Sequence, residues 1–395
     1  MRRNSNLGIG GRGRAFPSIP GLAPVLMVLI LAILAPLGIA GCGSSPGVSQ
    51  VPAAIEYAPL ERDDWPVSTP QEQGLDPALV GDLYHDATDL EKLYGVLVVK
   101  NGHLVAERYF NGGSVDQKAR LQSVTKSVTS ALVGLALDSR CLSSVDQKLL
   151  DFYPEVAGQI TDPRKEQITI RQMLQMRAGY PSEESHPDLW AGLVSGRYEP
   201  LIEAVPLATD PGTAFHYSNL TSNWLGIIVD RTCGMHLKEY AVENLFTPMG
   251  IEPGEWGADW DGHNNGCGDL HLTARDAAKF GQLYLDGGIY EGDQIVPADW
   301  VRDSLQTYTE GAWDNIGRFR DIGYGYQWWS ARAGDHQVNF AWGHGGQLIV
   351  LVDELDLVVV TTSDPFWLQH DGESWKHEKA TISMVADFVE SLPSE

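Results

Sequence analysis

Strand patterns at the two ends of the chain's main region constrain its fold more than any other feature. Near the N-terminal end, residues 94–100 and 103–110 are apolar, β-branched runs on either side of Asn101-Gly102. Asn-Gly between two such runs is the strongest short-range signal for a β-hairpin. Near the C-terminal end a tight acidic turn joins the last two of three further strand-like runs, at residues 324–329, 347–352 and 357–362.

Helical patterns fill the long stretch between these groups of strands, from Ser123 to about Ser304. One helix there has a capping-box-like start at Thr273-Ala-Arg-Asp276 and ends before Gly287-Gly288. A last helix, from about residue 375 to 391, follows the C-terminal strands. The sequence therefore predicts an α+β fold, in which N- and C-terminal strands form one antiparallel sheet flanked by helices and a mostly helical region is inserted between them.

Ser123-Val-Thr-Lys126 is the only Ser-x-x-Lys in the chain. Apolar residues at 128, 131, 132, 135 and 136 follow it and predict one face of a helix. Three-residue spacing places the Ser123 hydroxyl and the Lys126 amine on the same face, so the amine can accept the hydroxyl proton. The helix N-terminus would also favour an oxyanion. Nucleophile and base are thus predicted here, although an isolated Ser-x-x-Lys is usually a solvated surface pair.

A second pattern is Tyr217-Ser-Asn219, which follows a Pro-Gly turn and precedes a helix containing Leu225 and Ile228. A phenol and an amide two residues apart on a loop can point into one cleft. The phenol would pass protons, and the amide would hold a substrate carbonyl or the lysine. The alternative is a half-buried tyrosine in a turn.

A third pattern, His344-Gly345-Gly346, lies just before the predicted strand at 347–352. Two glycines would let a substrate backbone approach the edge of that strand, and the N–H of Gln347 would be a second oxyanion donor. The alternative is a glycine-rich bend that leads into a strand.

The three patterns occur in the order Ser-x-x-Lys, Tyr-x-Asn and His-Gly-Gly, and the third is predicted on a C-terminal strand. This order resembles that of the serine β-lactamase and penicillin-binding-protein superfamily. The patterns are most similar to the class C β-lactamase-like branch, which includes D-aminopeptidases, carboxylesterases and 6-aminohexanoate-dimer hydrolases. The resemblance covers roughly residues 64–390 and includes residues 121–127, 168–174 and 270–288. It implies a β-lactamase/transpeptidase-like fold.

The resemblance also implies roles for single residues. Ser123 would be the nucleophile, Lys126 its base, and Tyr217 the proton shuttle that later activates water, while Asn219 would orient the lysine and the substrate. A lysine base must be largely neutral, which predicts burial or a cationic neighbour. The family's familiar third motif is Lys-Thr-Gly, whose cation binds a β-lactam carboxylate. Here His344 stands in its place, which weakens a specific prediction of β-lactam hydrolysis.

Three functional hypotheses follow. The leading one is an exported serine hydrolase that cleaves a small-molecule ester or amide through an acyl-Ser123 intermediate, without a cofactor. The second is a β-lactamase or D-Ala-directed peptidase. The third is a catalytically silent relative that uses the cleft for binding. The intact Ser-Lys-Tyr set argues against it, because a binding protein has no need of a matched nucleophile and base. The sequence leaves the substrate and the oligomeric state open.

The first 41 residues have the composition of a targeting segment. They contain four arginines and no acid, and the apolar stretch from Leu22 to Ile39 runs into Ile39-Ala-Gly-Cys42. This predicts a lipoprotein signal peptide over residues 1–41 and a lipidated Cys42 that anchors the exported protein to the cell membrane. An uncleaved transmembrane anchor is the alternative. A tether at 42–63 and a hydrolase domain at 64–395 would follow.

Charge and cysteine content limit the partners and cross-links. The formal net charge is −24, and removal of the signal peptide with its four arginines leaves −28. So acidic a surface argues against nucleic acid and anionic lipid headgroups as ligands. Beyond Cys42, an odd number of cysteines permits one disulfide at most, and the spacing does not identify the pair among Cys141, Cys233 and Cys267.

One dense group of potential metal ligands is present, formed by His263, Cys267, Asp269 and His271. No second cluster completes a structural zinc site, so the sequence assigns no metal ligand. Among the twelve tryptophans, Trp328, Trp329 and Trp342 lie near the third pattern. Such residues belong more often to the core, and some can wall an apolar pocket.

Overall fold

The computed structural model describes residues 58–183, 186–365 and 372–394. Residues 54–395 form one compact unit, to which all of the described residues belong. Cys42, the predicted signal peptide and most of the predicted tether lie outside the described residues. Within the described ranges, no helix has the length and apolar character needed to cross a membrane.

A seven-stranded antiparallel sheet forms the centre of the unit, in the order β2-β1-β11-β10-β9-β8-β7. The predicted N-terminal hairpin is confirmed, and Asn101 and Gly102 form its turn with φ values of 51° and 71°. Strand β1 of this hairpin pairs with β11, so segments from both ends of the chain complete one sheet, as predicted. The strands are β1 (Leu93–Lys100), β2 (His103–Tyr109), β7 (Phe319–Tyr324), β8 (Trp329–Ala333), β9 (His336–Gly343), β10 (Gln347–Val352) and β11 (Leu357–Ser363).

The strand predicted at 324–329 is wrong. Only its two ends belong to strands, and the residues between them form a bend closed by a hydrogen bond from Gly325 N to Trp328 O of 2.7 Å. Gln327 in this bend has a left-handed φ of 61°. Trp328 is fully buried against Phe280, so tertiary packing accounts for the aromatic run that resembled a strand.

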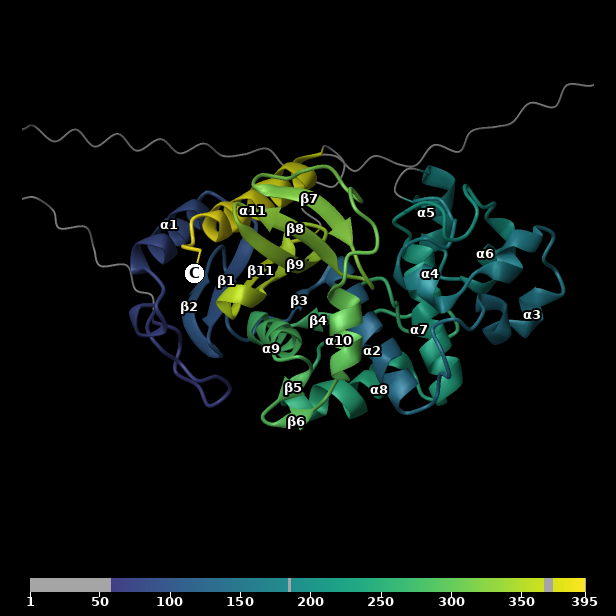
Figure 1. The fold of residues 1–395 in the computed structure, drawn as a ribbon, viewed down its shortest axis with the longest axis horizontal. Helices are drawn as coiled ribbons and strands as arrows, with labels where there is room; N and C mark the ends of the chain where they lie inside the picture. The colour runs from purple at the N-terminus through teal and green to yellow at the C-terminus, as the bar shows by residue number, and fades with distance from the viewer. Residues whose placement is uncertain (1–57, 184–185, 366–371, 395) are drawn as a thin grey trace, which may run out of the picture. The chain divides into compact units, whose positions relative to one another are not determined.

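Side chains alternate across the sheet and create two cores. In β11, Val358 and Val360 join the core beneath α2 and α9, whereas Leu357 and Val359 join the core beneath α1 and α11. Figure 1 shows α1 and α11 together on one face of the sheet and α9 on the other. The capped helix and the final helix are both confirmed. These four helices are α1 (Pro77–Thr88), α2 (Thr125–Asp138), α9 (Ala274–Leu285) and α11 (Glu373–Glu390).

The inserted region between the strands is mostly helical, as predicted. Helix α2 packs against α7 at the centre of this region, beside the sheet (Figure 1). The remaining helices are α3 (Pro154–Ala157), α4 (Ile170–Leu174), α5 (Pro187–Val194), α6 (Glu199–Ala204), α7 (Asn219–Cys233), α8 (Leu237–Ala241) and α10 (Ala298–Leu305). Two short antiparallel pairs are formed by β3 (Ala119–Arg120) with β4 (His271–Leu272), and by β5 (Ile289–Tyr290) with β6 (Asp293–Gln294).

The three cysteines in the described ranges are free thiols. Cys233, at the end of α7, lies beside Cys141. Burial, together with this neighbouring thiol, raises the pKa of Cys233 to about 12. Cys267 lies in the wall of the pocket described below.

Candidate active site

Ser123 lies where an extended segment turns into α2. It belongs to a 3-10 turn, Gln122–Val124, which continues directly into the helix. Gln122 has a left-handed φ of 48°, a conformation that costs energy for a residue with a side chain. The structure thus places Ser123 at the start of α2, as the sequence predicts, and the strained residue before it sets the direction of the turn.

Lys126 is buried, with 1% of its surface exposed. Its Nζ lies 2.8 Å from Ser123 Oγ, 2.7 Å from Asn219 Oδ1 and 2.9 Å from the carbonyl oxygen of Cys267. A neutral amine can donate to Asn219 and Cys267 and accept the Ser123 hydroxyl proton with its lone pair. A protonated amine can donate to all three oxygens. Both protonation states are therefore satisfied in the same geometry.

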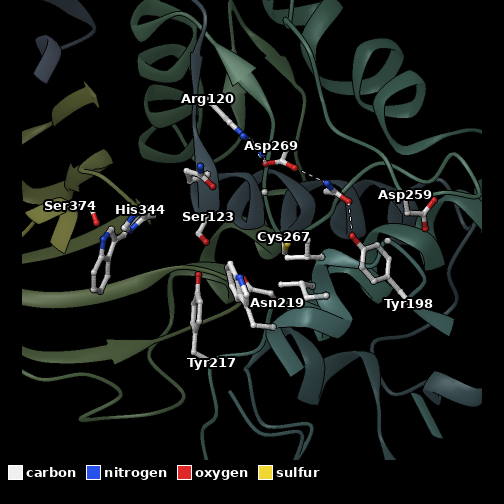
Figure 2. A pocket seen from close by; sticks show the side chains of 18 of the residues that line it. Arg120, Ser123, Tyr198, Tyr217, Asn219, Asp259, Cys267, Asp269, His344 and Ser374 are labelled. Carbon is white, nitrogen blue, oxygen red and sulfur yellow. Dashed lines mark hydrogen bonds and ion pairs between the residues drawn. The ribbon is translucent and has the colours of Figure 1, made fainter. Parts of the chain in front are cut away.

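Tyr217 lies against the same amine. Lys126 Nζ is 4.8 Å from the centroid of the Tyr217 ring, and the ring stacks on Trp329 with a centroid distance of 5.6 Å. Figure 2 shows the Tyr217 hydroxyl directed toward Ser123. The three residues predicted to be catalytic, Ser123, Lys126 and Tyr217, therefore come together in space.

Asn219 was predicted to lie on a loop. In the structure it is instead the first residue of helix α7. Ser218 caps this helix, and its hydroxyl donates to Glu183 with a distance of 2.7 Å. The fully buried Glu183 carboxylate also accepts from Asn219 N at 2.8 Å and Leu220 N at 3.0 Å. A carboxylate at a helix N-terminus pairs with unsatisfied N–H groups and with the helix dipole. Glu183 therefore fixes the helix end that carries Asn219.

His344 is held by a second buried carboxylate. Its Nδ1 lies 2.7 Å from Glu378 Oε2, and Glu378 comes from α11. The same carboxylate accepts from Trp342 Nε1 at 2.6 Å and from Gly345 N at 2.8 Å. These bonds fix the orientation of the His344 ring, which lines the pocket.

Gly345 and Gly346 have a different structural role from the one predicted. Strand β10 lies between β9 and β11, so these glycines do not open a strand edge to a substrate backbone. A Cβ at Gly345 would lie 2.6 Å from Pro365 Cα, and one at Gly346 would lie 2.8 Å from Thr381 Oγ1. With φ values of 81° and 90°, both residues allow close packing in a left-handed bend.

Gln347 is buried at the start of β10. Its side-chain amide pairs with the backbone of Ser363 through bonds of 2.8 and 3.0 Å. The side chain thus ties β10 to β11. The proposed contribution of its backbone N–H to an oxyanion hole stays a prediction.

Four of the predicted site residues border a pocket of about 1240 Å³, namely Ser123, Tyr217, Asn219 and His344. One wall is aromatic, with neighbouring rings in contact at centroid distances of 5.2 to 6.0 Å, and consists of Trp313, Trp329, Trp342 and Trp375. The rim is apolar and exposed, with Trp190 48%, Val194 70% and Trp260 77% exposed. The predicted apolar wall is confirmed for Trp329 and Trp342, whereas Trp328 is in the core.

An irregular segment, the 257–269 loop, forms the opposite wall. Asp269 of this loop accepts a hydrogen bond from Arg120 Nε at 2.7 Å, so the charges of Arg120 and Asp269 offset each other. The group considered as zinc ligands is split here. Asp269 pairs with Arg120, the Cys267 carbonyl faces Lys126, and His263 bonds to Asp230. Figure 2 shows the pairing of Asp269 with Arg120 and the position of Cys267 in the pocket.

The Beta-lactamase family model matches residues 94–376, and the chain therefore belongs to that family. This membership makes it a hydrolase of the superfamily that also contains the penicillin-binding proteins. The 6-aminohexanoate-dimer hydrolase of Paenarthrobacter ureafaciens is 27% identical over 298 residues, which cover 71% of this chain and 74% of the relative.

Solved structures confirm the predicted fold. A putative 6-aminohexanoate-dimer hydrolase from Bacillus anthracis matches with a TM-score of 0.62 and 22% identity, covering 78% of this chain and 83% of that one. The hydrolase EstCE1, described as having promiscuous acyltransferase activity, matches with a TM-score of 0.63 and 14% identity, covering 78% and 99%. At these identities the likeness concerns the fold alone.

Neither Glu183 nor Glu378 could be predicted as a site residue, because neither belongs to a local sequence pattern. Glu183→Gln provides a test of the first. The amide would keep one acceptor but present an N–H group to backbone donors, so we expect the free energy of unfolding to fall by about 1–3 kcal/mol. We also expect slower hydrolysis, because Asn219 would lose its support. Denaturant unfolding and initial rates on an ester would measure both effects.

The matched control is Glu252→Gln, at an exposed glutamate. It should change the free energy of unfolding by less than about 0.5 kcal/mol. Native stability and native rates in Glu183→Gln would show that the carboxylate is not needed to hold α7.

Proposed function

We propose that this protein is a serine hydrolase that cleaves an ester or amide through an acyl-Ser123 intermediate. The observation that carries the proposal is the position of Lys126 Nζ, within 2.9 Å of Ser123 Oγ, Asn219 Oδ1 and the Cys267 carbonyl oxygen in the wall of a large pocket. A nucleophile, a buried base and its orienting acceptors are the components that acyl transfer requires.

In the acylation step, Ser123 Oγ attacks the carbonyl carbon of the substrate while Lys126 takes the hydroxyl proton. Backbone N–H groups at the start of α2, together with that of Gln347, would stabilise the oxyanion. The tetrahedral intermediate then collapses, and the leaving alcohol or amine receives a proton through Tyr217. The proton that Lys126 took from Ser123 Oγ thus ends on the leaving group, which departs as a neutral alcohol or amine and leaves the Ser123 ester behind.

In the deacylation step, water attacks the Ser123 ester. Tyr217, supported by Lys126, accepts a proton from the water as it adds to the acyl carbon. The intermediate expels Ser123 Oγ, which regains its proton, and the carboxylic acid leaves. Lys126 can relay protons throughout because its neutral and charged states have hydrogen-bond partners in the same geometry.

The pocket favours an uncharged substrate with a sizeable apolar group. Its aromatic wall and exposed Trp190 and Trp260 offer apolar surface, and Arg120 is already paired with Asp269. The similarity to a 6-aminohexanoate-dimer hydrolase supports a second substrate class, a linear amide with a terminal carboxylate and a terminal amine. A panel of p-nitrophenyl esters, linear amide oligomers, nitrocefin and D-Ala dipeptides would rank these classes.

Hydrolysis of β-lactams or D-Ala peptides is the second candidate. Family membership and the position of His344 on the pocket wall favour it. His344 stands where the family has the cation that binds the carboxylate of such substrates. We therefore rank hydrolysis of β-lactams and D-Ala peptides below hydrolysis of neutral esters and amides.

The nucleophile assignment predicts that a fluorophosphonate labels the protein once, at Ser123. Ser123→Ala should abolish the label, and Lys126→Ala or Tyr217→Phe should lower kcat by about two to four orders of magnitude, the usual scale for acid–base groups. Intact-mass measurement and ester kinetics would test these effects. An adduct that persists in Ser123→Ala would falsify the assignment.

The binding role of His344 predicts a change in substrate preference. His344→Lys would place a permanent cation near the pocket, so the ratio of kcat/KM for nitrocefin to kcat/KM for a neutral ester should rise. His344→Ala should mainly raise KM, because the lost contact is shared by ground and transition states. If His344→Lys leaves the ratio unchanged, His344 does not occupy the carboxylate-binding position.

We also propose that the protein is exported and anchored by a lipid on Cys42. The arginine-containing start, the apolar stretch and Ile39-Ala-Gly-Cys42 support this proposal. The mature protein should begin at a lipidated Cys42 and partition into the detergent phase. In Cys42→Ala, lipidation and normal maturation should fail, as N-terminal mass spectrometry would show. A lipid-modified protein that still begins at residue 42 in this variant would contradict the assignment.

A further inference from the structure

We propose that Asp230, His236 and His263 bind a divalent transition-metal ion, Zn²⁺ in particular, at a site separate from Ser123. In the described part of the chain, these three residues are the group of histidine, cysteine and carboxylate side chains that could jointly hold a metal ion. Their ligand atoms all lie within 4.8 Å of one another. Neither the sequence pattern nor the proposed hydrolysis calls for this arrangement.

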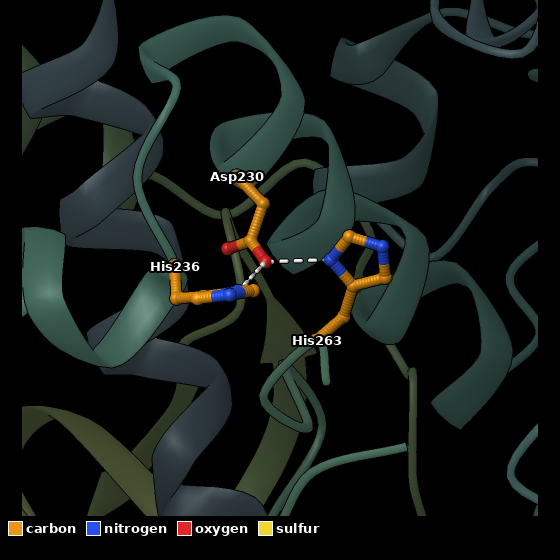
Figure 3. A group of neighbouring side chains, drawn as sticks. All are labelled: Asp230, His236 and His263. Atoms are coloured by element: carbon orange, nitrogen blue, oxygen red, sulfur yellow. Dashed lines mark hydrogen bonds and ion pairs between the residues drawn. The ribbon is translucent and has the colours of Figure 1, made fainter. Parts of the chain in front are cut away.

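Three separate segments bring the ligands together. Asp230 lies near the C-terminal end of α7, His236 directly precedes α8, and His263 lies on the 257–269 loop. Figure 3 shows both imidazole rings turned toward the same carboxylate. Asp230 Oδ2 is 2.6 Å from His263 Nδ1 and 3.3 Å from His236 Nδ1.

The Asp230 carboxylate is incompletely satisfied by these two contacts. Its side chain is only 4% exposed, and the buried Oδ1 has no hydrogen-bond partner among the residues that the structure describes. A buried carboxylate oxygen without a partner is costly, and both histidines bond to the other oxygen. A metal ion between the carboxylate and the two rings would supply the missing positive charge.

The surrounding charge also favours a cation. The Asp259 carboxylate, which accepts a hydrogen bond from His263 N at 2.8 Å, adds a second negative charge close to the group. Arg231, the cation next to Asp230 in the sequence, is directed to Glu155 and Glu199 through contacts of 2.7 and 3.4 Å. The site thus lies in a negative field that an added divalent ion would offset.

The donor set selects the class of metal. Two imidazole nitrogens and one carboxylate suit Zn²⁺ and its first-row neighbours, whereas Ca²⁺ and Mg²⁺ require mostly oxygen ligands. Each histidine would bind as a neutral ring that carries its proton on Nε2 and offers the Nδ1 lone pair to the metal, so any further ring proton is released to solvent. The His236 side chain is 54% exposed, so solvent can reach the site and provide a fourth ligand.

Such a metal would be structural. The loop that carries His263 also carries Asp259 and Trp260 on the pocket wall and the Cys267 carbonyl that faces Lys126. An ion joining His263 to Asp230 would fasten the outer part of this loop to α7. The reaction at Ser123 would take no step through the metal.

The test uses the full-length chain, produced without a polyhistidine tag and treated with a chelator that is then removed. Titration with Zn²⁺, followed by calorimetry, should saturate at one ion per chain and raise the thermal unfolding midpoint. Co²⁺ should give the intense visible absorption of a tetrahedral ion. The chelator should reverse both effects.

Variants locate the ion. His236→Ala and Asp230→Asn should each weaken Zn²⁺ binding by more than about a hundredfold, beyond the scale for loss of an outer-shell partner. His271→Ala is the matched control, because His271 lies on β4 and its Nδ1 faces backbone carbonyls; it should bind Zn²⁺ like the native chain. Circular dichroism without metal would show that each variant is folded.

Two results would overturn the proposal. One is a native chain that shows no saturable binding at one ion per chain. The other is binding that persists unchanged in both His236→Ala and Asp230→Asn, which would place the ion elsewhere. Because the readouts are metal binding and thermal stability, they are independent of whether Ser123 is the nucleophile.

Discussion

Burial of the Lys126 amine is the constraint on which the rest of the site depends. An amine taken out of water is costly unless each of its hydrogen-bonding positions has a partner. The partners come from three places, the turn before α2, the start of α7 and the 257–269 loop. Helices α2 and α7 must therefore pack in one relative position, and the loop must reach between them. Chemistry at Ser123 and packing of the helical region are consequences of the same requirement.

Two buried carboxylates hold the residues around this amine and the pocket in place. Glu183 fixes the start of α7 and so the amide of Asn219, while Glu378 fixes His344 and the bend that follows β9. Each accepts bonds from backbone and side chain together, which makes it rigid. These residues position others and need not touch a substrate.

Local sequence patterns predicted those elements that depend on interactions between residues close together in the sequence. Asn101-Gly102 specifies a hairpin turn, alternation and β-branching specify β10 and β11, and Thr273 specifies a helix start. Ser123 and Lys126 were found because their spacing on one helix face already implies contact. The prediction of a strand at 324–329 was wrong because aromatic residues occur in a buried bend as readily as in a strand. Only tertiary contacts distinguish the two.

Other parts depend on contacts between distant segments and could not be read from the sequence. Glu183 and Glu378 lie 36 and 33 residues from the backbone N–H groups of Asn219 and Gly345 that they accept from. Gly345 and Gly346 were predicted to give a substrate access to a strand edge, whereas in the structure they allow close packing against Pro365 and Thr381. Both roles require glycine, so the sequence alone does not distinguish them. His263 was noticed as a possible ligand, whereas its actual neighbours, Asp230 and His236, lie on other segments.

The 257–269 loop is held to the helices by its inner half independently of any ion. Thr129 Oγ1 donates to the Gly266 carbonyl at 2.8 Å, and Cys267 N donates to Asn223 Oδ1 at 3.0 Å. These bonds come from α2 and α7, the helices that also carry Lys126 and Asn219, so they fix the Cys267 carbonyl where the lysine needs it. The outer half, with His263 and the pocket-lining Trp260, has its own attachment at Asp230. Different contacts within one loop therefore hold the acceptor of Lys126 and the outer part of the pocket wall.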